Sequence, residues 1–489
     1  MTSRTSVAAV PSVPRKVLTE GSGVNKSIAA IEYAVRGELV LRAEALAKQL
    51  PSVDLPFDKI VYCNIGNPQS VGQSPITFVR QVLAGVTCPS LLQPESGNVF
   101  PSDVVKRVTD VLAASHGVGA YSESKGIRFI RERVANALQA RDDGVPANPD
   151  NIYLTNGASE AVKTILSMLV RDHNDGVLIP IPQYPLYSAA MTAFGGTQVG
   201  YYLDEENGWS LNMDELETRL SDARAKGITV RAIVIINPGN PTGQVLSRTN
   251  MEDVVAFCER EKLVILADEV YQKNVYIPEK PFISFKKVTH EMGADVELAS
   301  FHSVSKGVMG ECGLRGGYME VVNMDRYIQE LIYKVLSVSL CSNIIGQVAI
   351  DLMMTPPQPG EPSYELYNKE VDEIYGALKR KAIAMSDGLN TFEGVTCNRS
   401  EGAMYLFPRI TIPPAAVKAA AARGMASADV LYCIEMLEAT GICVVPGSGF
   451  LQKDGTYHFR TTFLPPEKEI RNVITSMRRF HEQFMAKYS

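Results

Sequence analysis

Cysteine pairs and long apolar runs are both missing from this sequence of 489 residues. Its 8 cysteines are scattered and none forms a C-x-x-C pair, so neither a disulfide framework nor a zinc site is expected. A reducing compartment fits this use of cysteine best. No apolar run approaches the roughly 18 residues needed to span a bilayer. The strongest runs, such as residues 232–236, have the length of a strand.

The sequence also lacks a strong excess of one charge. Lys and Arg total 48 and Asp and Glu total 54, which gives a formal net charge of -6. This balance argues against nucleic acid or a membrane surface as a partner. The apolar fraction of 45% and charged fraction of 21% are ordinary for a globular enzyme. The length predicts two or more domains, and the absence of an internal repeat excludes a solenoid.

Acidic residues are absent from the first 19 residues, which contain Ser, Thr, Arg and Lys. This composition is compatible with a mitochondrial transit peptide and equally with a disordered tail. No secretory apolar segment is present, and the C-terminal residues 486–489 are not a peroxisomal address. We therefore expect a cytoplasmic protein, with a mitochondrial location as the alternative.

Short apolar runs alternate with helical segments in the middle of the chain. Strands are predicted at residues 151–154, 176–181, 230–236, 263–267, 297–302 and 317–322, and helices at 159–170, 213–225 and 251–262. Asn212 or Asp214 is available to cap the second of these helices. The alternation predicts an α/β fold with a mostly parallel sheet. Since ligands bind at the carboxyl ends of such strands, the loops that follow the strands are the places to look for chemistry.

A stretch rich in Pro and Gly at residues 353–362 predicts a domain boundary. A long helix at 364–390, strands at 403–407, 442–445 and 458–463, and a terminal helix at 467–487 predict a smaller α+β domain. The expected organisation is a large domain at 96–352 and a small domain at 353–489. Residues 1–95 carry little sheet signal and are expected to pack with the small domain.

Two of the strand-end loops could bind anionic or oxygen-containing groups. The strand at 151–154 leads into Gly157-Ala158-Ser159, where free N–H groups at a helix start would cradle a phosphate. The alternative is that Ser159 is an ordinary helix cap. The strand at 230–236 leads into residues 237–243, where Asn240 can donate its amide to a ligand oxygen. The alternative there is a rigid turn.

Two further loops place a carboxylate and an amine at the same edge of the predicted sheet, where the strands have their carboxyl ends. Asp268 follows a buried strand and needs a partner, for which a protonated pyridine nitrogen would serve. A helix cap or a buried salt bridge is the alternative. Lys306 follows the strand at 297–302 in a loop of small and hydroxyl residues, where it could form an imine with an aldehyde cofactor. A solvated surface lysine is the alternative.

Together these loops supply, in order, an anion cradle, an Asn turn, an Asp followed by Tyr271, a lysine and then Arg315. Pyridoxal 5′-phosphate (PLP) needs such a set. Its phosphate binds N–H groups, hydroxyls and Arg, its ring nitrogen binds a carboxylate, and its aldehyde binds a lysine.

Longer phrases of the sequence resemble the fold-type I PLP-dependent aminotransferases, and more narrowly the alanine aminotransferases. The matching phrases are residues 63–68 (CNIGNP), 119–122 (GAYS), 181–187 (IPQYPLY), 267–272 (ADEVYQ), 301–317, 440–450 (TGICVVPGSGF) and 455–460 (GTYHFR). They cover nearly the whole chain after about residue 25. One departure is that Arg315 lies nine residues after Lys306, where many relatives have eight. The alanine aminotransferases share the longer spacing of nine residues.

The resemblance implies a role for each matching residue. Lys306 is expected to bind the cofactor aldehyde and later to move the proton, and Asp268 to pair with the ring nitrogen. Asn240 and Tyr271 are expected to donate to the phenolic oxygen, and Tyr184 to stack on the ring. The implied phosphate contacts are Ala158, Ser159, Ser303 and Arg315, with Tyr121 from a neighbouring subunit. The implied substrate contacts are Arg460 with the α-carboxylate, Asn240, and Gly66 over the substrate.

The resemblance also implies a seven-stranded sheet, a homodimer with its sites at the subunit interface, and amino-acid and 2-oxo-acid substrates. The expected reaction is reversible amino transfer between L-alanine and 2-oxoglutarate. Glutamate–glyoxylate transamination is the alternative within the family. The fold also occurs as a ligand-sensing module of transcription regulators, but the first 95 residues show no basic helix-turn-helix pattern.

Overall fold

A seven-stranded sheet forms the centre of the protein, with strand order β2-β8-β7-β6-β5-β3-β4. The computed structural model describes residues 18, 23–33, 37–50, 52–93, 95, 97 and 99–489. The strands are β2 (Ile152–Thr155), β3 (Asp175–Ile181), β4 (Thr197–Tyr202), β5 (Thr229–Ile236), β6 (Val264–Asp268), β7 (Leu298–Ser303) and β8 (Gly317–Val322). All neighbours pair in parallel except β8, which is antiparallel to both β7 and β2. The predicted α/β fold with a mostly parallel sheet is confirmed.

The sequence predicted six of these strands to within two residues and missed β4. This strand lies at the edge of the sheet, where it pairs with β3 alone. It begins with polar residues, contains Gly200, and is only partly buried along its length. An edge strand with one solvated side lacks the continuous apolar run that identifies a central strand.

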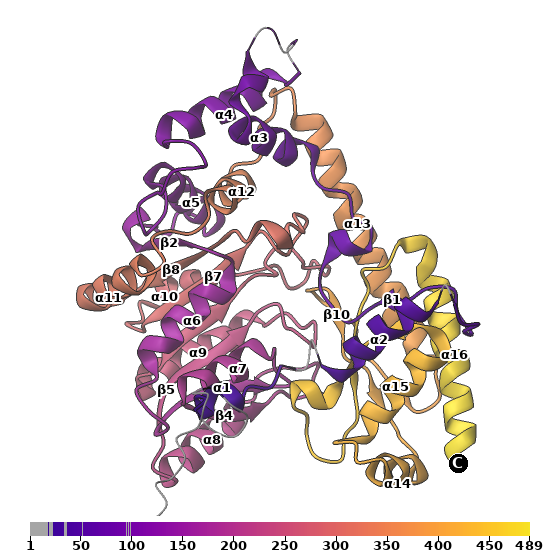
Figure 1. The fold of residues 1–489 in the computed structure, drawn as a ribbon. Coiled ribbons are helices and arrows are strands. Elements are labelled where there is room, and N and C mark those ends of the chain that lie inside the picture. The colour runs from indigo at the N-terminus through magenta and orange to yellow at the C-terminus, as the bar shows by residue number, and fades with distance from the viewer. Residues whose placement is uncertain are drawn as a thin grey trace, which may run out of the picture.

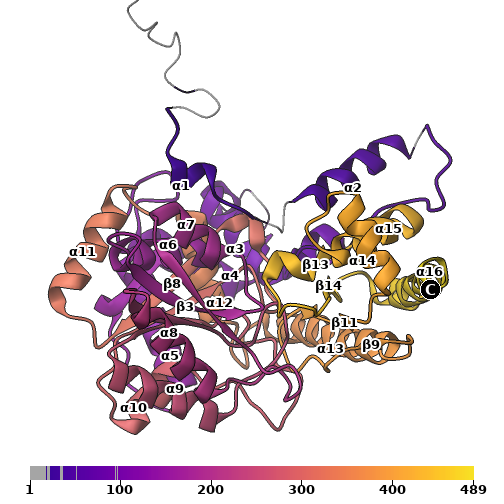
Figure 2. The same cartoon turned by 90° about the horizontal axis from the view of Figure 1, so that it is seen from below.

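Helices cover both faces of the sheet, and side chains of β5 alternate between the two resulting cores. Ala232 and Val234 pack with α6 (Ala158–Leu169) and α7 (Leu186–Phe194), whereas Ile233 and Ile235 pack with α8 (Met213–Ala225), α9 (Arg248–Glu261) and α10 (Phe285–Met292). Figure 2 shows these two groups of helices on opposite sides of the sheet. Of the two candidate caps of α8, Asn212 is the one used: its side chain accepts from the amides of Asp214 and Glu215.

A second body is built from short strands and long helices (Figure 1). Strands β10 (Tyr405–Leu406), β14 (Phe459–Thr462) and β13 (Val445–Pro446) form an antiparallel sheet. Helices α13 (Tyr364–Leu389), α15 (Ala428–Thr440) and α16 (Glu467–Tyr488) pack around it. The predicted strand at 442–445 is wrong as one element. The chain changes partner at Val444, so that β12 (Ile442–Cys443) pairs with β1 (Val61–Tyr62) and β13 pairs with β14.

The N-terminal segment divides between the two bodies. Helix α2 (Glu38–Gln49) packs on α15, and β1 joins β12, so this part shares the core of the smaller body. Helix α3 (Thr77–Thr87) instead packs on α4 (Ser102–Ala114) and α12 (Ile344–Met354), beside the large sheet (Figure 1). Residues 1–19, for which the sequence left a transit peptide and a disordered tail open, lie outside the described residues, apart from Leu18. Over the described part of the chain, no helix is both long enough and apolar enough to cross a membrane.

Candidate active site

Three neighbouring strands, β5, β6 and β7, end beside one another and deliver Asn240, Asp268 and Lys306 to the same edge of the sheet. Strand β2 runs in the same direction as β7, because both are antiparallel to β8 between them. The loop after β2 therefore also lies at this edge. The parallel topology explains why residues far apart in the sequence meet here.

Asp268 is the last residue of β6 and is buried. One carboxylate oxygen accepts from the hydroxyl of Tyr187 at 2.8 Å and the other from the amide of Val270 at 3.4 Å. No Lys or Arg in the described part of the chain forms an ion pair with it, and no α-helix begins between residues 269 and 284. The alternatives of a helix cap and a salt bridge are therefore wrong. Burial raises the pKa of Asp268 to about 6, although Tyr187 opposes this shift.

Lys306 follows β7 and is half-buried rather than solvated at the surface. Its amine donates to the carbonyl of Gly66 at 2.7 Å and lies 5.9 Å from the ring centre of Tyr271. A side chain at Gly66 would place its Cβ 2.9 Å from this amine and 2.2 Å from the hydroxyl oxygen of Tyr405. Only glycine fits here without movement of these groups, so Gly66 closes over the lysine as expected for a segment that covers a small ligand.

A backbone cradle lies where β2 enters helix α6. Gly157 precedes the helix with φ 77° and no side-chain cap, and Ala158 and Ser159 form its first turn. The alternative of Ser159 as the helix cap is therefore wrong. A Cβ at Gly157 would lie 2.3 Å from a guanidinium nitrogen of Arg315, which donates to the carbonyl of Asn156 at 3.2 Å. Free first-turn amides beside an arginine form an anion site. Ser303, at the end of β7, is buried at the same edge.

Arg460 reaches the site from β14 in the smaller body. It is 1% exposed, yet no acidic side chain of the described residues pairs with it. Its guanidinium lies 4.4 Å from the ring centre of Tyr405 and 4.7 Å from that of Phe450. It donates to Asn240 Oδ1 at 3.2 Å and to the carbonyl of Asn64, while its Nε has no partner. A buried guanidinium without an anion is costly, and its planar fork matches a carboxylate.

Asn240 also contributes more than a turn, because its side chain contacts this arginine and is itself buried. Tyr184 is half-buried, and its hydroxyl lies 3.1 Å from that of Tyr33. Burial, together with Tyr33, raises the pKa of Tyr184 well above its usual value, so it is a neutral aromatic surface in the site.

Sequence reasoning missed three tyrosines that the structure places here: Tyr33, Tyr187 and Tyr405. Tyr405 was contained in a predicted strand, but nothing in the sequence showed that this strand pairs with the one carrying Arg460. Tyr187 lies one helical turn after Tyr184, within a phrase that the sequence did single out. These tyrosines reach the site through contacts between segments that are far apart in the sequence, and local sequence patterns do not reveal such contacts.

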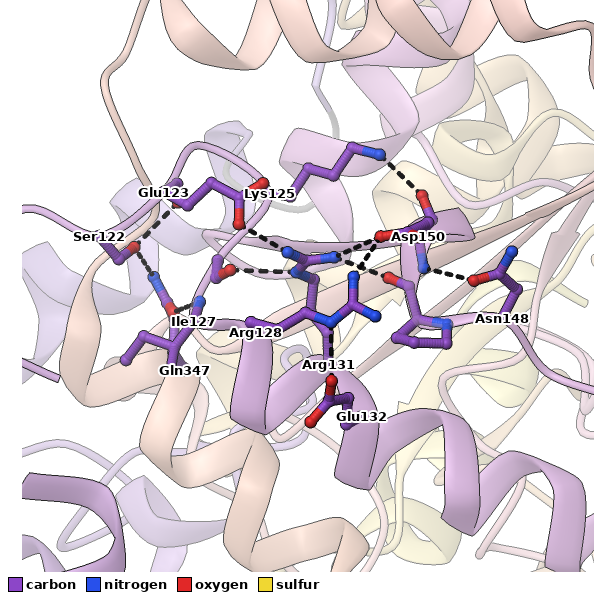
Figure 3. Close-up of polar contacts among 12 residues, drawn as sticks. Ser122, Glu123, Lys125, Ile127, Arg128, Arg131, Glu132, Asn148, Asp150 and Gln347 are labelled. Carbon is purple, nitrogen blue, oxygen red and sulfur yellow. Dashed lines mark hydrogen bonds and ion pairs between the residues drawn. The ribbon is translucent and has the colours of Figure 1, made fainter. Parts of the chain in front are cut away.

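Tyr121 stands apart from the other predicted residues. Its side chain is 75% exposed and makes no hydrogen bond among the described residues. The loop that carries it is nevertheless anchored, as Figure 3 shows: Glu123 pairs with the buried Arg131 at 2.6 Å, and Lys125 donates to the carbonyl of Asp150 at 2.7 Å. Gln347 of α12 also donates to the hydroxyl of Ser122 at 3.0 Å. The structure thus presents Tyr121 outward on a fixed loop.

Comparison with known proteins agrees with this geometry. Residues 92–477 match the family described as aminotransferase class I and II. The chain belongs to this family. Enzymes of the family are PLP-dependent transferases.

This aminotransferase is 55% identical to a protein of Dictyostelium discoideum named "Probable alanine aminotransferase, mitochondrial", over 94% of this chain and 88% of that one. It is 49% identical to glutamate–glyoxylate aminotransferase 1 of Arabidopsis thaliana, over 95% and 96% of the two chains. The solved structure of an alanine aminotransferase from Pyrococcus furiosus superposes with a TM-score of 0.74 at 25% identity, covering 94% of this chain and 100% of that one.

The residues of this aminotransferase fit PLP. The buried carboxylate of Asp268 lacks a cationic partner, and a pyridinium nitrogen is the group that would supply one. The cradle at Gly157, which any side chain would fill, suits a phosphate. Lys306 provides an amine at the same edge of the sheet. No group of three or more His, Cys, Asp or Glu able to hold a metal occurs in the described part of the chain.

Proposed function

We propose that the protein transfers an amino group reversibly between L-alanine and 2-oxoglutarate, giving pyruvate and L-glutamate. The observation that carries the proposal is the convergence of Lys306 with Arg460, a buried arginine that has no anion of its own. An amine for the cofactor and a clamp for a carboxylate are the two groups that amino-acid chemistry requires in one place. The relative named alanine aminotransferase supports the choice of substrate.

PLP supplies an aldehyde that binds amines and a ring that accepts electrons from the substrate carbon. Asp268 would hold the proton on the ring nitrogen, since an ionised carboxylate beside that nitrogen favours the charged form. Asn240 and Tyr271 would donate to its phenolic oxygen, and Tyr184 would face its ring. Ala158, Ser159, Ser303 and Arg315 would hold its phosphate.

Arg460 binds the substrate α-carboxylate through its guanidinium fork, with Asn240 beside it. The amine of Lys306 would hold and move the proton of the substrate α-carbon. Gly66 and Tyr405 lie close to the amine, and the less water they leave beside it, the stronger these polar contacts would be.

An assay of pyruvate formed from L-alanine and 2-oxoglutarate tests the reaction. Formation of pyruvate that depends on added PLP is the expected result. Absence of pyruvate at every substrate concentration would contradict the proposal.

Glutamate–glyoxylate transamination is the second candidate, favoured by the 49% identity to the Arabidopsis protein of that name. The two reactions share small substrates and the same carboxylate clamp. The ratio of rates with pyruvate and with glyoxylate as amino acceptor separates them: a higher kcat/KM for pyruvate supports the first reaction, and a higher value for glyoxylate the second.

We further propose a homodimer in which Tyr121 of each subunit reaches the phosphate of the other. The anchored loop of Tyr121 lies beside the end of α11 (Arg326–Ser337), since Ser124 donates to the carbonyl of Leu340 at 2.7 Å. This surface exposes apolar side chains that include Val338, which is 86% exposed. An exposed aromatic on a fixed loop next to apolar residues is typical of an interface. Sedimentation velocity should give the mass of two chains.

The cytoplasm is the proposed location, with mitochondria as the alternative that the name of the Dictyostelium relative favours. The full chain fused at its C-terminus to a fluorescent protein separates them. Diffuse fluorescence supports the cytoplasm, and overlap with a mitochondrial dye supports the alternative.

A further inference from the structure

Tyr405 is a buried phenol at the centre of the site. Its side chain is 2% exposed, and the hydroxyl of Tyr271 donates to its oxygen at 3.0 Å. The two rings meet edge to face, with centres 5.9 Å apart and an angle of 85° between their planes. The guanidinium of Arg460 also lies against Tyr405, 4.4 Å from its ring centre. Tyr405 therefore touches the groups proposed for cofactor and for substrate at once.

The backbone fixes this position. Tyr405 lies on β10, which pairs with β14 so that Tyr405 faces Thr462 and Leu406 faces Thr461. Arg460 is two residues from Thr462 along β14, so phenol and guanidinium are held by one sheet. Gly66 leaves no space beside the hydroxyl, since a Cβ there would lie 2.2 Å from the phenol oxygen. The hydroxyl of Tyr405 is thus directed at Tyr271 by its surroundings.

The hydrogen bonds available to the two phenols restrict what each can do. In the described part of the chain, their mutual bond is the only hydrogen bond that either hydroxyl makes. A tyrosine has one O–H to donate and an oxygen that can still accept. If Tyr271 gives its proton to the phenolic oxygen of PLP, its own oxygen is free to accept from Tyr405.

We propose that Tyr405 is a positioning residue that acts through Tyr271: it donates to the Tyr271 oxygen while Tyr271 donates to the phenolic oxygen of bound PLP. This proposal rests on the proposed function. A hydrogen bond received by Tyr271 polarises its O–H and strengthens the bond that Tyr271 donates. It also holds the Tyr271 hydroxyl in the one rotation that aims at the cofactor.

Charged and titratable groups surround this pair. Burial by itself would raise the pKa of Tyr405, but the positive charges of Lys306 and Arg460, together with the hydrogen bond from Tyr271, lower it. The groups that face the pair are Lys306, Arg460, Cys312, Tyr184 and Asp268. Tyr405→Phe leaves all of them in place and removes only the hydroxyl, so its effect isolates the proposed hydrogen bond.

The test is a pH titration of the visible absorption band of the PLP-loaded protein, which reports the protonation of the linkage between PLP and Lys306. Donation by Tyr271 stabilises the negative phenolic oxygen and hence the unprotonated form, so losing it raises the midpoint. We expect Y271F to raise the midpoint by about 1 pH unit and Y405F by a few tenths of a unit. The double variant Y271F/Y405F should match Y271F alone, because Tyr405 acts through Tyr271.

Tyr201→Phe is the matched control. Tyr201 is also a buried phenol with one hydrogen bond, to the carbonyl of Val234, but it packs on the far core of the sheet. Its midpoint should equal that of the wild type. An unchanged midpoint in Y405F, or a double variant whose shift is the sum of the single shifts, would overturn the role of Tyr405 alone. Absence of a visible band in the wild-type protein after incubation with PLP would overturn the proposed function, and this inference with it.

Discussion

The two halves of the site are built in different ways. Asn240, Asp268 and Lys306 come from the ends of long buried parallel strands in the large sheet. Arg460 and Tyr405 come from two short antiparallel strands in the smaller body. The first half follows from the direction of the strands, whereas the second requires that two bodies be placed side by side. The comparison shows that one part of a site can follow from the direction of neighbouring strands, while another part depends on how two bodies of the protein pack together.

A similar contrast separates two adjacent carboxylates, Asp268 and Glu269. The first lies on the site side and has only Tyr187 and a backbone amide as partners. The second is turned into the protein, where it accepts from the hydroxyl of Ser300 at 2.7 Å and the amide of Phe285 at 2.9 Å. Successive residues of an extended chain point to opposite sides, so adjacent acids serve different purposes.

The largest effect is expected from removing the chemistry of the sheet half. Lys306→Ala should lower kcat by at least about 10³-fold, because it removes both the covalent attachment and the proton carrier. Steady-state rates of pyruvate formation measure this, and the exposed Lys226→Ala serves as the control. A variant K306A with more than a tenth of the wild-type rate would contradict the role of this lysine.

The smaller-body half is expected to control substrate binding. Arg460→Lys should lower kcat/KM for L-alanine by about 10²-fold, because an ammonium cannot bind a carboxylate with two parallel hydrogen bonds. The visible cofactor band should persist, which separates this effect from that of K306A. Arg409→Gln, on the nearby strand β11 (Arg409–Ile410), is the control. Loss of the cofactor band in R460K, with substrate affinity intact, would reverse the assignment of the two halves.

Asp268 and Glu269 should also differ in how PLP changes the pH dependence of stability. Burial raises the pKa of Asp268 from 3.8 to about 6 and that of Glu269 from 4.5 to about 7. A folded pKa above the unfolded one means that the folded apoprotein binds protons more tightly, so its stability falls as pH rises through these windows. In the proposed site PLP would pair with Asp268 and not with Glu269, so it should offset only the loss of stability between about pH 4 and 6.

Thermal unfolding between pH 4.5 and 7.5 measures this difference. We expect the increase in Tm on adding PLP to grow by a few degrees from low to high pH in the wild type and in E269Q. In D268N the increase in Tm on adding PLP should be the same at low and high pH. If this pH dependence disappeared in E269Q and survived in D268N, the acid facing the cofactor would be Glu269.

The smallest effect is expected at the proposed subunit interface. Tyr121→Phe should weaken PLP binding by about 10-fold at most, through loss of one hydrogen bond to a phosphate. Fluorescence titration of the apoprotein measures it, and the exposed Tyr327→Phe on α11 is the control. Unchanged PLP affinity in a variant that still dimerises would remove Tyr121 from the site.

How much could be predicted from the sequence differs between the halves for a physical reason. Apolar runs identified β5, β6 and β7, and parallel pairing brings the ends of such strands together, so the sequence alone placed Asp268 and Lys306 at one edge of the sheet. The smaller-body strands are two to four residues long and change partners at Val444, so periodicity could neither delimit nor pair them. Arg460 was found through family resemblance alone, and Tyr405 was missed.

The central claim is that Lys306 and Arg460 serve one cofactor and one amino acid in a single site. An absorption spectrum of the PLP-loaded protein before and after adding L-alanine tests it most directly. The account predicts a visible band that falls on adding alanine, while a band nearer the ultraviolet rises. A visible band that ignores L-alanine but responds to another amino acid would contradict the proposed substrate, and the absence of any band after incubation with PLP would contradict the account itself.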